Sequence, residues 1–224
     1  QSAAESDAEN MYLLSNRNTD LQNDTIFLLE ITGRATDPTA QLVVNTLQAD
    51  QPYILPVPAE QAGNQWFDTN DSRILGGYVR NDQINFVQSC TDPITGTSAI
   101  YHGIIDGVTS GPSISSRIYS EPGLYYGYPN ISWSGLHEND YQSIISFNHS
   151  SETEFAGFSA LHVNGQFQAS NRVEIKAGFS LVNVLGDTLE RWGDYSGSQR
   201  LYGQPGTVWA SGSFGNSSNG HGTW

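Results

Sequence analysis

The segment Asp68-Thr69-Asn70-Asp71 brings three carboxylate or amide side chains together within four residues. Hard cations such as Ca²⁺ collect carboxylate and amide oxygens together with backbone carbonyls. Asp68, Asn70 and Asp71 are therefore candidate calcium ligands, and Ca²⁺ is the cofactor that the sequence suggests. The same residue types also form Asx turns that cap a following strand, so a purely structural turn is the alternative interpretation.

A dense aromatic group follows later in the chain. Tyr125, Tyr126 and Tyr128 lie beside Pro129 and ahead of Trp133. Aromatic faces with polar neighbours suit stacking on sugar rings or a protein interface. Tyr125, Tyr126 and Trp133 are therefore candidate ligand-binding residues. Alternation with a period of two would instead bury Tyr126, Tyr128 and Trp133, and this core interpretation is the favoured one.

The histidine and cysteine residues give weaker evidence for a metal site or a reactive group. The histidines at positions 102, 137, 149, 162 and 221 show no spacing typical of a metal site. Cys90 is the single cysteine, so no disulfide can form within the chain. Because its neighbours have the pattern of a strand, Cys90 is predicted to be a buried thiol.

The elements that must position these residues are predicted to be β-strands. Short alternating runs are separated by turns rich in Asn, Asp, Gly and Pro. The expected strands are residues 11–15, 25–32 and 41–46, then 72–79, 83–91, 97–106 and 113–119, then 127–134, 141–150, 155–163 and 166–175.

Between these strands, the proline-bearing segment 49–68 is predicted to be a long connection. Asn164-Gly165 predicts a hairpin turn. Residues 181–192 have a leucine spacing that allows a helix, which Gly186 weakens. A four-stranded unit that recurs about every 50 to 60 residues is typical of propeller blades.

The C-terminal part carries a family resemblance. The run Arg191-Trp192-Gly193-Asp194-Tyr195-Ser196-Gly197, with Trp209-Ala210-Ser211-Gly212 after it, resembles a motif of secreted bacterial β-propellers of the sialidase-like type. Two upstream pieces, Asp71-Ser72-Arg73-Ile74 and Tyr128-Pro129-Asn130-Ile131, are similar to blade segments of the same proteins. The resemblance implies an all-β propeller, of which about three and a half four-stranded blades of six to eight are visible. It makes Arg191, Trp192, Asp194, Tyr195 and Trp209 structural motif residues.

The resemblance also raises a catalytic alternative, because sialidases hydrolyse glycosides. Such an enzyme needs an arginine cluster, a Tyr/Glu nucleophile pair and an acidic Asp. Arg73, Arg117, Arg172 and Arg191 are available, but the catalytic spacing of the family is missing. This favours a non-catalytic binding or structural module, for adhesion or a surface filament. A sialidase-like glycoside hydrolase and a carbohydrate-binding propeller remain the alternatives.

Composition narrows the partners. The chain has 224 residues, 9 basic and 23 acidic, for a formal net charge of −14. Such a surface repels nucleic-acid phosphates and anionic lipid headgroups, and no apolar run is long enough to enter a membrane. We expect one domain over residues 1–224, with a disordered lead-in at 1–10. We expect an extracellular or cell-surface location. The expected partner is a protein or a glycan, and a protein partner can be another part of the same polypeptide or assembly.

Overall fold

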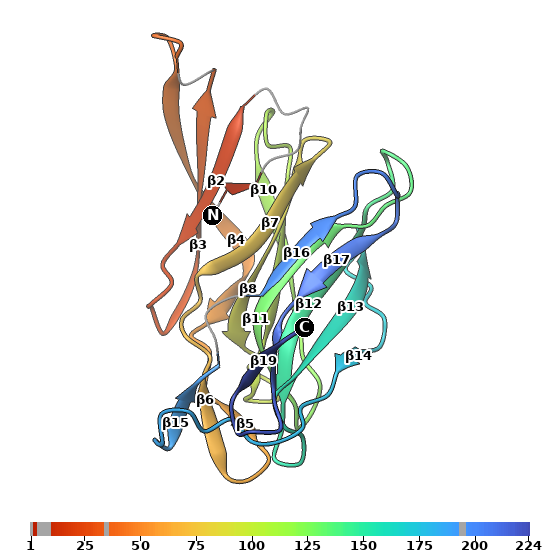
Figure 1. Ribbon diagram of the computed structural model, residues 1–224. Coiled ribbons are helices and arrows are strands. Elements are labelled where there is room, and N and C mark those ends of the chain that lie inside the picture. Colours follow the sequence, from red (N-terminus) through yellow and green to blue (C-terminus); the bar gives the residue numbers. More distant parts are fainter. Residues whose placement is uncertain (1, 4–9, 34–35, 193–195) are drawn as a thin grey trace.

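The computed structural model describes residues 2–3, 10–33, 36–192 and 196–224 (Figure 1). The described residues form strands, turns and bends, and none of them is helical. The all-β prediction is confirmed, and the helix allowed over 181–192 is absent. No described helix is long and apolar enough to cross a membrane.

Twelve of the strands form three successive layers. Layer 1 contains β1 (Ser2–Ala3), β2 (Met11–Asn16), β3 (Gln22–Thr32) and β4 (Gln41–Ile54). Layer 2 contains β7 (Ile74–Arg80), β8 (Gln83–Thr91), β9 (Ser98–Asp106) and β10 (Ser113–Tyr119). Layer 3 contains β11 (Tyr125–Trp133), β12 (Gln142–Ser150), β13 (Gly157–Asn164) and β14 (Val173–Lys176).

The remaining strands form smaller sheets. The strands β15 (Leu189–Arg191), β6 (Gln65–Asp68) and β5 (Ala59–Gln61) form one of them. The hairpin of β16 (Gly197–Arg200) and β17 (Val208–Ser211), named here the outer ribbon, contacts β11 and β12 of layer 3. A last hairpin joins β18 (Ser213–Gly215) to β19 (His221–Thr223).

Each layer is an antiparallel meander, in which consecutive strands are neighbours. Layers 1 and 2 are also joined edge to edge, because β10 pairs in parallel with β4 through Ile114 and Ala49. The result is one eight-stranded sheet in the order β1-β2-β3-β4-β10-β9-β8-β7. The expected number of blades is not confirmed, because layers 1 and 2 share this sheet and each of the small sheets has fewer than four strands.

The layers stack face to face, from left to right in Figure 1. One apolar cluster lies between layers 1 and 2 and includes Tyr53, Phe86 and Tyr101. A second lies between layers 2 and 3 and includes Val87 and Phe147. Layer 2 is therefore covered on both faces, which explains why β8 and β9 are almost continuously buried. Cys90 lies in the first cluster and is fully buried, as predicted.

The predictions for β7 to β13 match to within a few residues. The strand predicted over 166–175 begins only at Val173, and the segment 49–68 was wrongly predicted as a connection. It contains the end of β4 and all of β5 and β6. Pro52 is tolerated because the pairing of β3 with β4 shifts between Asn23 and Thr25, which removes Pro52 from the hydrogen-bonded ladder. In the predicted lead-in, Ser2–Ala3 pairs with β2, and residues 4–9 lie outside the described part.

Candidate functional site

The predicted calcium ligands lie in the turn between β6 and β7. The Asp68 Oδ1 atom accepts a hydrogen bond from the backbone N–H of Asn70 at 2.8 Å. Asp71 accepts hydrogen bonds from the backbone N–H of Arg73 at 2.9 Å, from the Arg73 Nε at 2.8 Å and from the Asn18 Nδ2 at 2.6 Å. Burial pushes the pKa of Asp71 upward, but these hydrogen bonds outweigh it and hold the pKa below its ordinary value. The contacts are those of an Asx turn, and calcium binding here stays a prediction.

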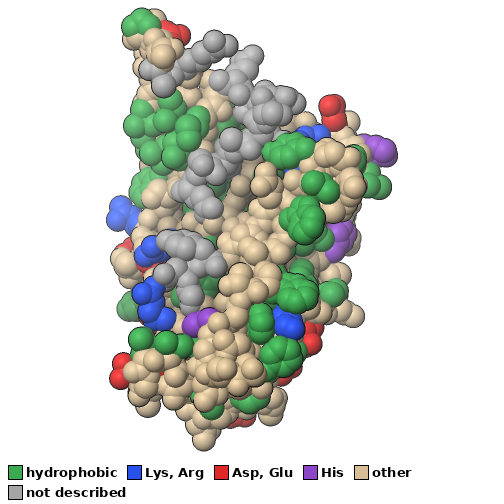
Figure 2. Space-filling model, viewed as in Figure 1, with side chains coloured by type: hydrophobic (Ala, Val, Ile, Leu, Met, Phe, Trp, Pro, Cys, Tyr) green, Lys and Arg blue, Asp and Glu red, His purple; other side chains and the backbone are tan. Residues whose placement is uncertain are grey.

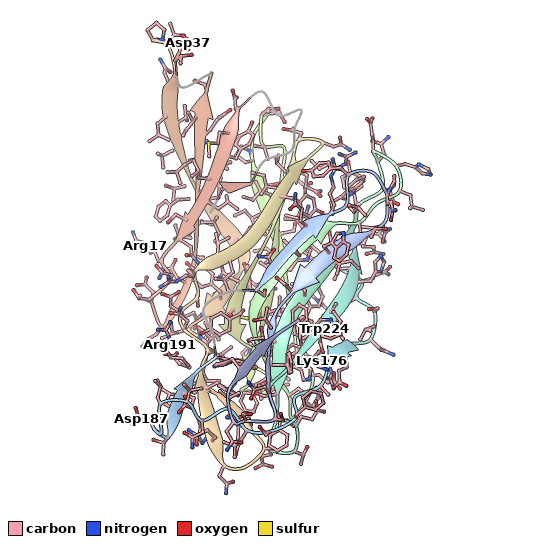
Figure 3. The ribbon with its side chains drawn as sticks, in the orientation of Figure 1. Arg17, Asp37, Lys176, Asp187, Arg191 and Trp224 are labelled. Carbon is pink, nitrogen blue, oxygen red and sulfur yellow. The ribbon has the colours of Figure 1, made fainter. Side chains whose placement is uncertain are left out.

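The motif residues have different environments. Trp192 is 1% exposed and stacks on Phe67, with 4.7 Å between ring centroids. Arg191 is exposed (Figure 3). Its carbonyl oxygen accepts a hydrogen bond from the His221 Nε2 at 2.8 Å. Trp209 is 68% exposed on β17. Asp194 and Tyr195 lie outside the described residues.

The three aromatic candidates are separated by the fold. Tyr126 and Trp133 are buried between layers 2 and 3, as the core interpretation predicts. Tyr125 is half-buried on another face and meets Trp66 edge to face, with ring centroids 6.2 Å apart. Tyr125 and Trp66 line a shallow apolar cleft of about 420 Å³ that also includes Leu189. The sequence-predicted patch therefore does not form one binding surface.

A polar groove that the sequence did not reveal lies between β10 and the segment 166–172. Its volume is about 1250 Å³. It opens because β10 pairs with β4 only at Ile114, so that in the described residues the following part of β10 is an unpaired edge. Hydroxyl, amide and charged side chains predominate in its lining, which includes Ser115, Ser120, Gln168, Asn171, Arg172 and Glu121.

One wall of the groove is a strained hairpin loop. The Phe167 N–H donates to the Asn164 carbonyl and the Asn164 N–H donates to the Gln168 carbonyl, both at 3.1 Å, so three residues form the loop rather than the two expected from Asn164-Gly165. Phe167 has a φ of 60°, at the position where such loops usually have glycine. Its ring meets His102 edge to face at 5.1 Å. Strained backbone conformations of this kind cluster at binding and active sites, which makes Phe167 a candidate site residue.

A cluster of charged side chains lies where the groove meets β14. The Arg172 guanidinium lies 3.7 Å from the Glu121 carboxylate, 3.4 Å from Glu154 and 4.0 Å from Glu174. Glu121 also accepts a hydrogen bond from the Tyr126 hydroxyl at 3.0 Å. Arg172 thus links the groove to the carboxylates of Glu154 and Glu174, which lie behind it.

His149 lies behind this cluster and is fully buried. Its Nδ1 is 2.8 Å from the Ser159 Oγ, and its Nε2 is 3.5 Å from an oxygen of Glu154 and 3.5 Å from an oxygen of Glu174. Burial, with the positive charge of Arg172 second, lowers the pKa of His149 to about 3. The imidazole is therefore neutral near pH 7. Ser159 is also fully buried, so no substrate reaches its hydroxyl and this Ser-His-Glu arrangement is not a nucleophilic triad.

Comparison with protein-family models, with curated proteins and with solved structures found no match for this chain. The groove and the charged cluster are therefore defined by their geometry alone.

A signal for the cluster was present in the sequence. Once residues 141–150 and 155–163 are taken as paired strands, His149 and Glu154 must lie at the same end of a hairpin. The register then places Ser159 opposite Glu174 on β14. A search for histidine spacing along the chain misses this arrangement, because its members converge across strands.

Proposed function

We propose that the protein is a non-catalytic extracellular binding module that holds a neutral glycan in the groove between β10 and residues 166–172. The single observation that carries this proposal is the groove itself, whose wall includes a strained aromatic residue. The proposal selects the glycan from the two partner classes, protein and glycan, that the sequence suggests.

The lining favours a sugar over a protein surface. Serine hydroxyls and the amides of Gln168 and Asn171 match the hydroxyl groups of a sugar chain, whereas the centre of a protein interface is more apolar. Phe167 and Tyr119 supply aromatic carbon beside these polar groups. The formal net charge of −14 disfavours an anionic ligand, so a neutral glycan fits best.

Hydrolysis is the less favoured alternative. Tyr126 and Glu121, with Arg172 nearby, are the residue types of a sialidase-like nucleophile pair. However, Tyr126 is 2% exposed, and burial together with Glu121 raises the pKa of its hydroxyl well above the ordinary value. A buried, protonated phenol is a poor nucleophile.

The stacked layers support the proposal that the chain contributes blades to a propeller. Layers 2 and 3 are consecutive four-stranded antiparallel meanders packed face to face, and the outer ribbon begins a further layer on β11. At the other end, hydrophobic side chains gather over layer 1 in Figure 2, where Leu42 and Val44 share one face of β4 and are exposed. We expect further polypeptide or a partner in an assembly to cover this face.

The test is a glycan array with the labelled full chain, followed by titration of any bound glycan against the variant Phe167→Gly. Glycine accepts the φ of 60° and removes only the ring, so we expect a folded protein that binds about 3- to 10-fold more weakly. The control Trp209→Ala removes an exposed aromatic ring outside the groove and should bind like the wild type.

Absence of glycan binding, or equal binding by Phe167→Gly and the wild type, would refute the groove proposal. Release of sugar from the bound glycan, or cleavage of an aryl glycoside, would support the hydrolase instead.

A further inference from the structure

Three side chains from different segments converge at one end of layer 3. His149 belongs to β12, Glu154 to the turn that follows, and Glu174 to β14. One ligand atom from each lies within 4.8 Å of the other two. We propose that these three residues bind a divalent cation of the zinc class. The proposal is independent of the glycan proposal, because it needs no residue of the groove.

The spacing suits a tetrahedral centre. The His149 Nε2 is 3.5 Å from the nearest oxygen of each glutamate. Zinc ligands at about 2.0–2.1 Å from the metal in a tetrahedron are roughly 3.4 Å from one another. Both distances from the imidazole match this spacing, and the three ligand atoms lie within 4.8 Å of one another, so a cation can bind between them with water completing its coordination.

The imidazole points to a ligand on independent grounds. The His149 Nε2 is buried and has no hydrogen-bond partner among the described residues. An unsatisfied buried polar atom destabilises the fold, and a bound cation would satisfy it. The opposite ring nitrogen contacts Ser159 at 2.8 Å, which fixes the ring orientation as partners of metal-bound histidines do.

The backbone leaves room for this ring and holds the turn. A Cβ atom on Gly157 would lie 2.6 Å from the His149 Nε2, so only glycine permits the imidazole position. The Glu154 carbonyl accepts hydrogen bonds from the N–H groups of Ala62 and Ser151, both at 3.2 Å. The Glu154 N–H is 2.9 Å from the Ser151 Oγ. The first two ligands therefore come from a preorganised hairpin end.

The ligand types decide the metal class. One imidazole nitrogen with two carboxylate oxygens suits Zn²⁺ or Mn²⁺, whereas Ca²⁺ and Mg²⁺ prefer oxygen alone. Arg172 is the competing cation. Its distances of 3.4 Å to Glu154 and 4.0 Å to Glu174 are longer than the roughly 2.7–2.9 Å of a strong charged hydrogen bond, so it leaves carboxylate capacity for a metal.

The test uses the full chain, stripped with EDTA and desalted, in isothermal titration with ZnCl₂ and MnCl₂ and in thermal unfolding with each metal. We expect one equivalent of Zn²⁺ to bind and to raise the melting temperature. Glu174→Gln should weaken binding at least about tenfold. Glu174 is partly exposed, with 46% of its side chain accessible, so this variant should fold, which circular dichroism checks.

The matched control is Glu152→Gln, an exposed carboxylate in the same turn, which should bind Zn²⁺ like the wild type. Co²⁺ in place of Zn²⁺ should give the intense visible absorption of a tetrahedral site in the wild type and lose it in Glu174→Gln. The proposal is overturned if neither metal binds. It is also overturned if Glu174→Gln and Glu152→Gln bind Zn²⁺ equally, since Glu174 is then not a metal ligand.

Discussion

Lys176, the single lysine of the chain, is enclosed by aromatic rings, and its removal gives a sharp prediction. Its Nζ lies 4.4 Å from the ring centroid of Phe179, 5.1 Å from that of Phe214 and 4.9 Å from that of Trp224. Figure 3 shows Lys176 and Trp224 beside each other. The ammonium group therefore fastens the hairpin β18–β19 to β14 of layer 3.

The magnitude follows from these three contacts. A cation over an aromatic face at a partly exposed site contributes about 0.5–1 kcal/mol. The three rings share one charge, so the contributions do not add fully, and the total is roughly 1–2 kcal/mol. For a chain of this size that loss lowers the melting temperature by roughly 2–8 °C. Lys176→Met removes the charge but keeps an apolar stem of similar length.

The assay is urea unfolding followed by circular dichroism, with melting curves as a second measurement. Lys176→Met should unfold at lower urea with an unchanged dependence on urea concentration. Lys176→Arg keeps the charge over the rings and should retain most of the stability. The reasoning fails if Lys176→Met is as stable as the wild type, or if Lys176→Arg loses as much as Lys176→Met.

Two further predictions concern a buried histidine and a tightly packed glycine. Burial lowers the pKa of His102 to about 3, so below about pH 6.5 the unfolded chain takes up a proton that the folded chain does not, and stability falls as the pH falls toward 3. We expect the free energy of unfolding, measured by urea unfolding in EDTA between pH 6 and 4, to depend on pH less steeply in His102→Gln than in the wild type, by about 1.4 kcal/mol per pH unit. Equal slopes in the two proteins would contradict this. A Cβ atom on Gly212 would lie 2.1 Å from the fully buried Phe158 ring. Gly212→Ala should therefore lower the free energy of unfolding by about 1–3 kcal/mol. The control Gly203→Ala is exposed and has open space at its Cβ, so it should lower this free energy much less. Equal stability of the two variants would show that Phe158 can move aside.

Local pattern was enough to predict most strands. The run that became β8 has turns on both sides and apolar residues facing each way, so its limits follow from its own sequence. The same reasoning missed the end of β4, β5 and β6, because prolines normally mark connections. The shift in the pairing of β3 with β4, which accommodates Pro52, is a property of two strands together. It also considered Tyr125, Tyr126 and Trp133 as one ligand-binding patch, but Tyr125 points to the opposite face of β11 from Tyr126, whereas Tyr126 and Trp133 share one buried cluster.

The sequence by itself determined that the chain is all-β and strongly acidic, and that its central strands carry apolar residues on both faces. Those properties depend on neighbouring residues and on composition. Tertiary structure alone decided that layer 2 lies between layers 1 and 3, that β10 leaves a groove beside Phe167, and that His149, Glu154 and Glu174 meet. The physical reason is that strand register and layer stacking are set by contacts between residues far apart in the chain, and a period of two along one strand carries no information about which strand lies opposite.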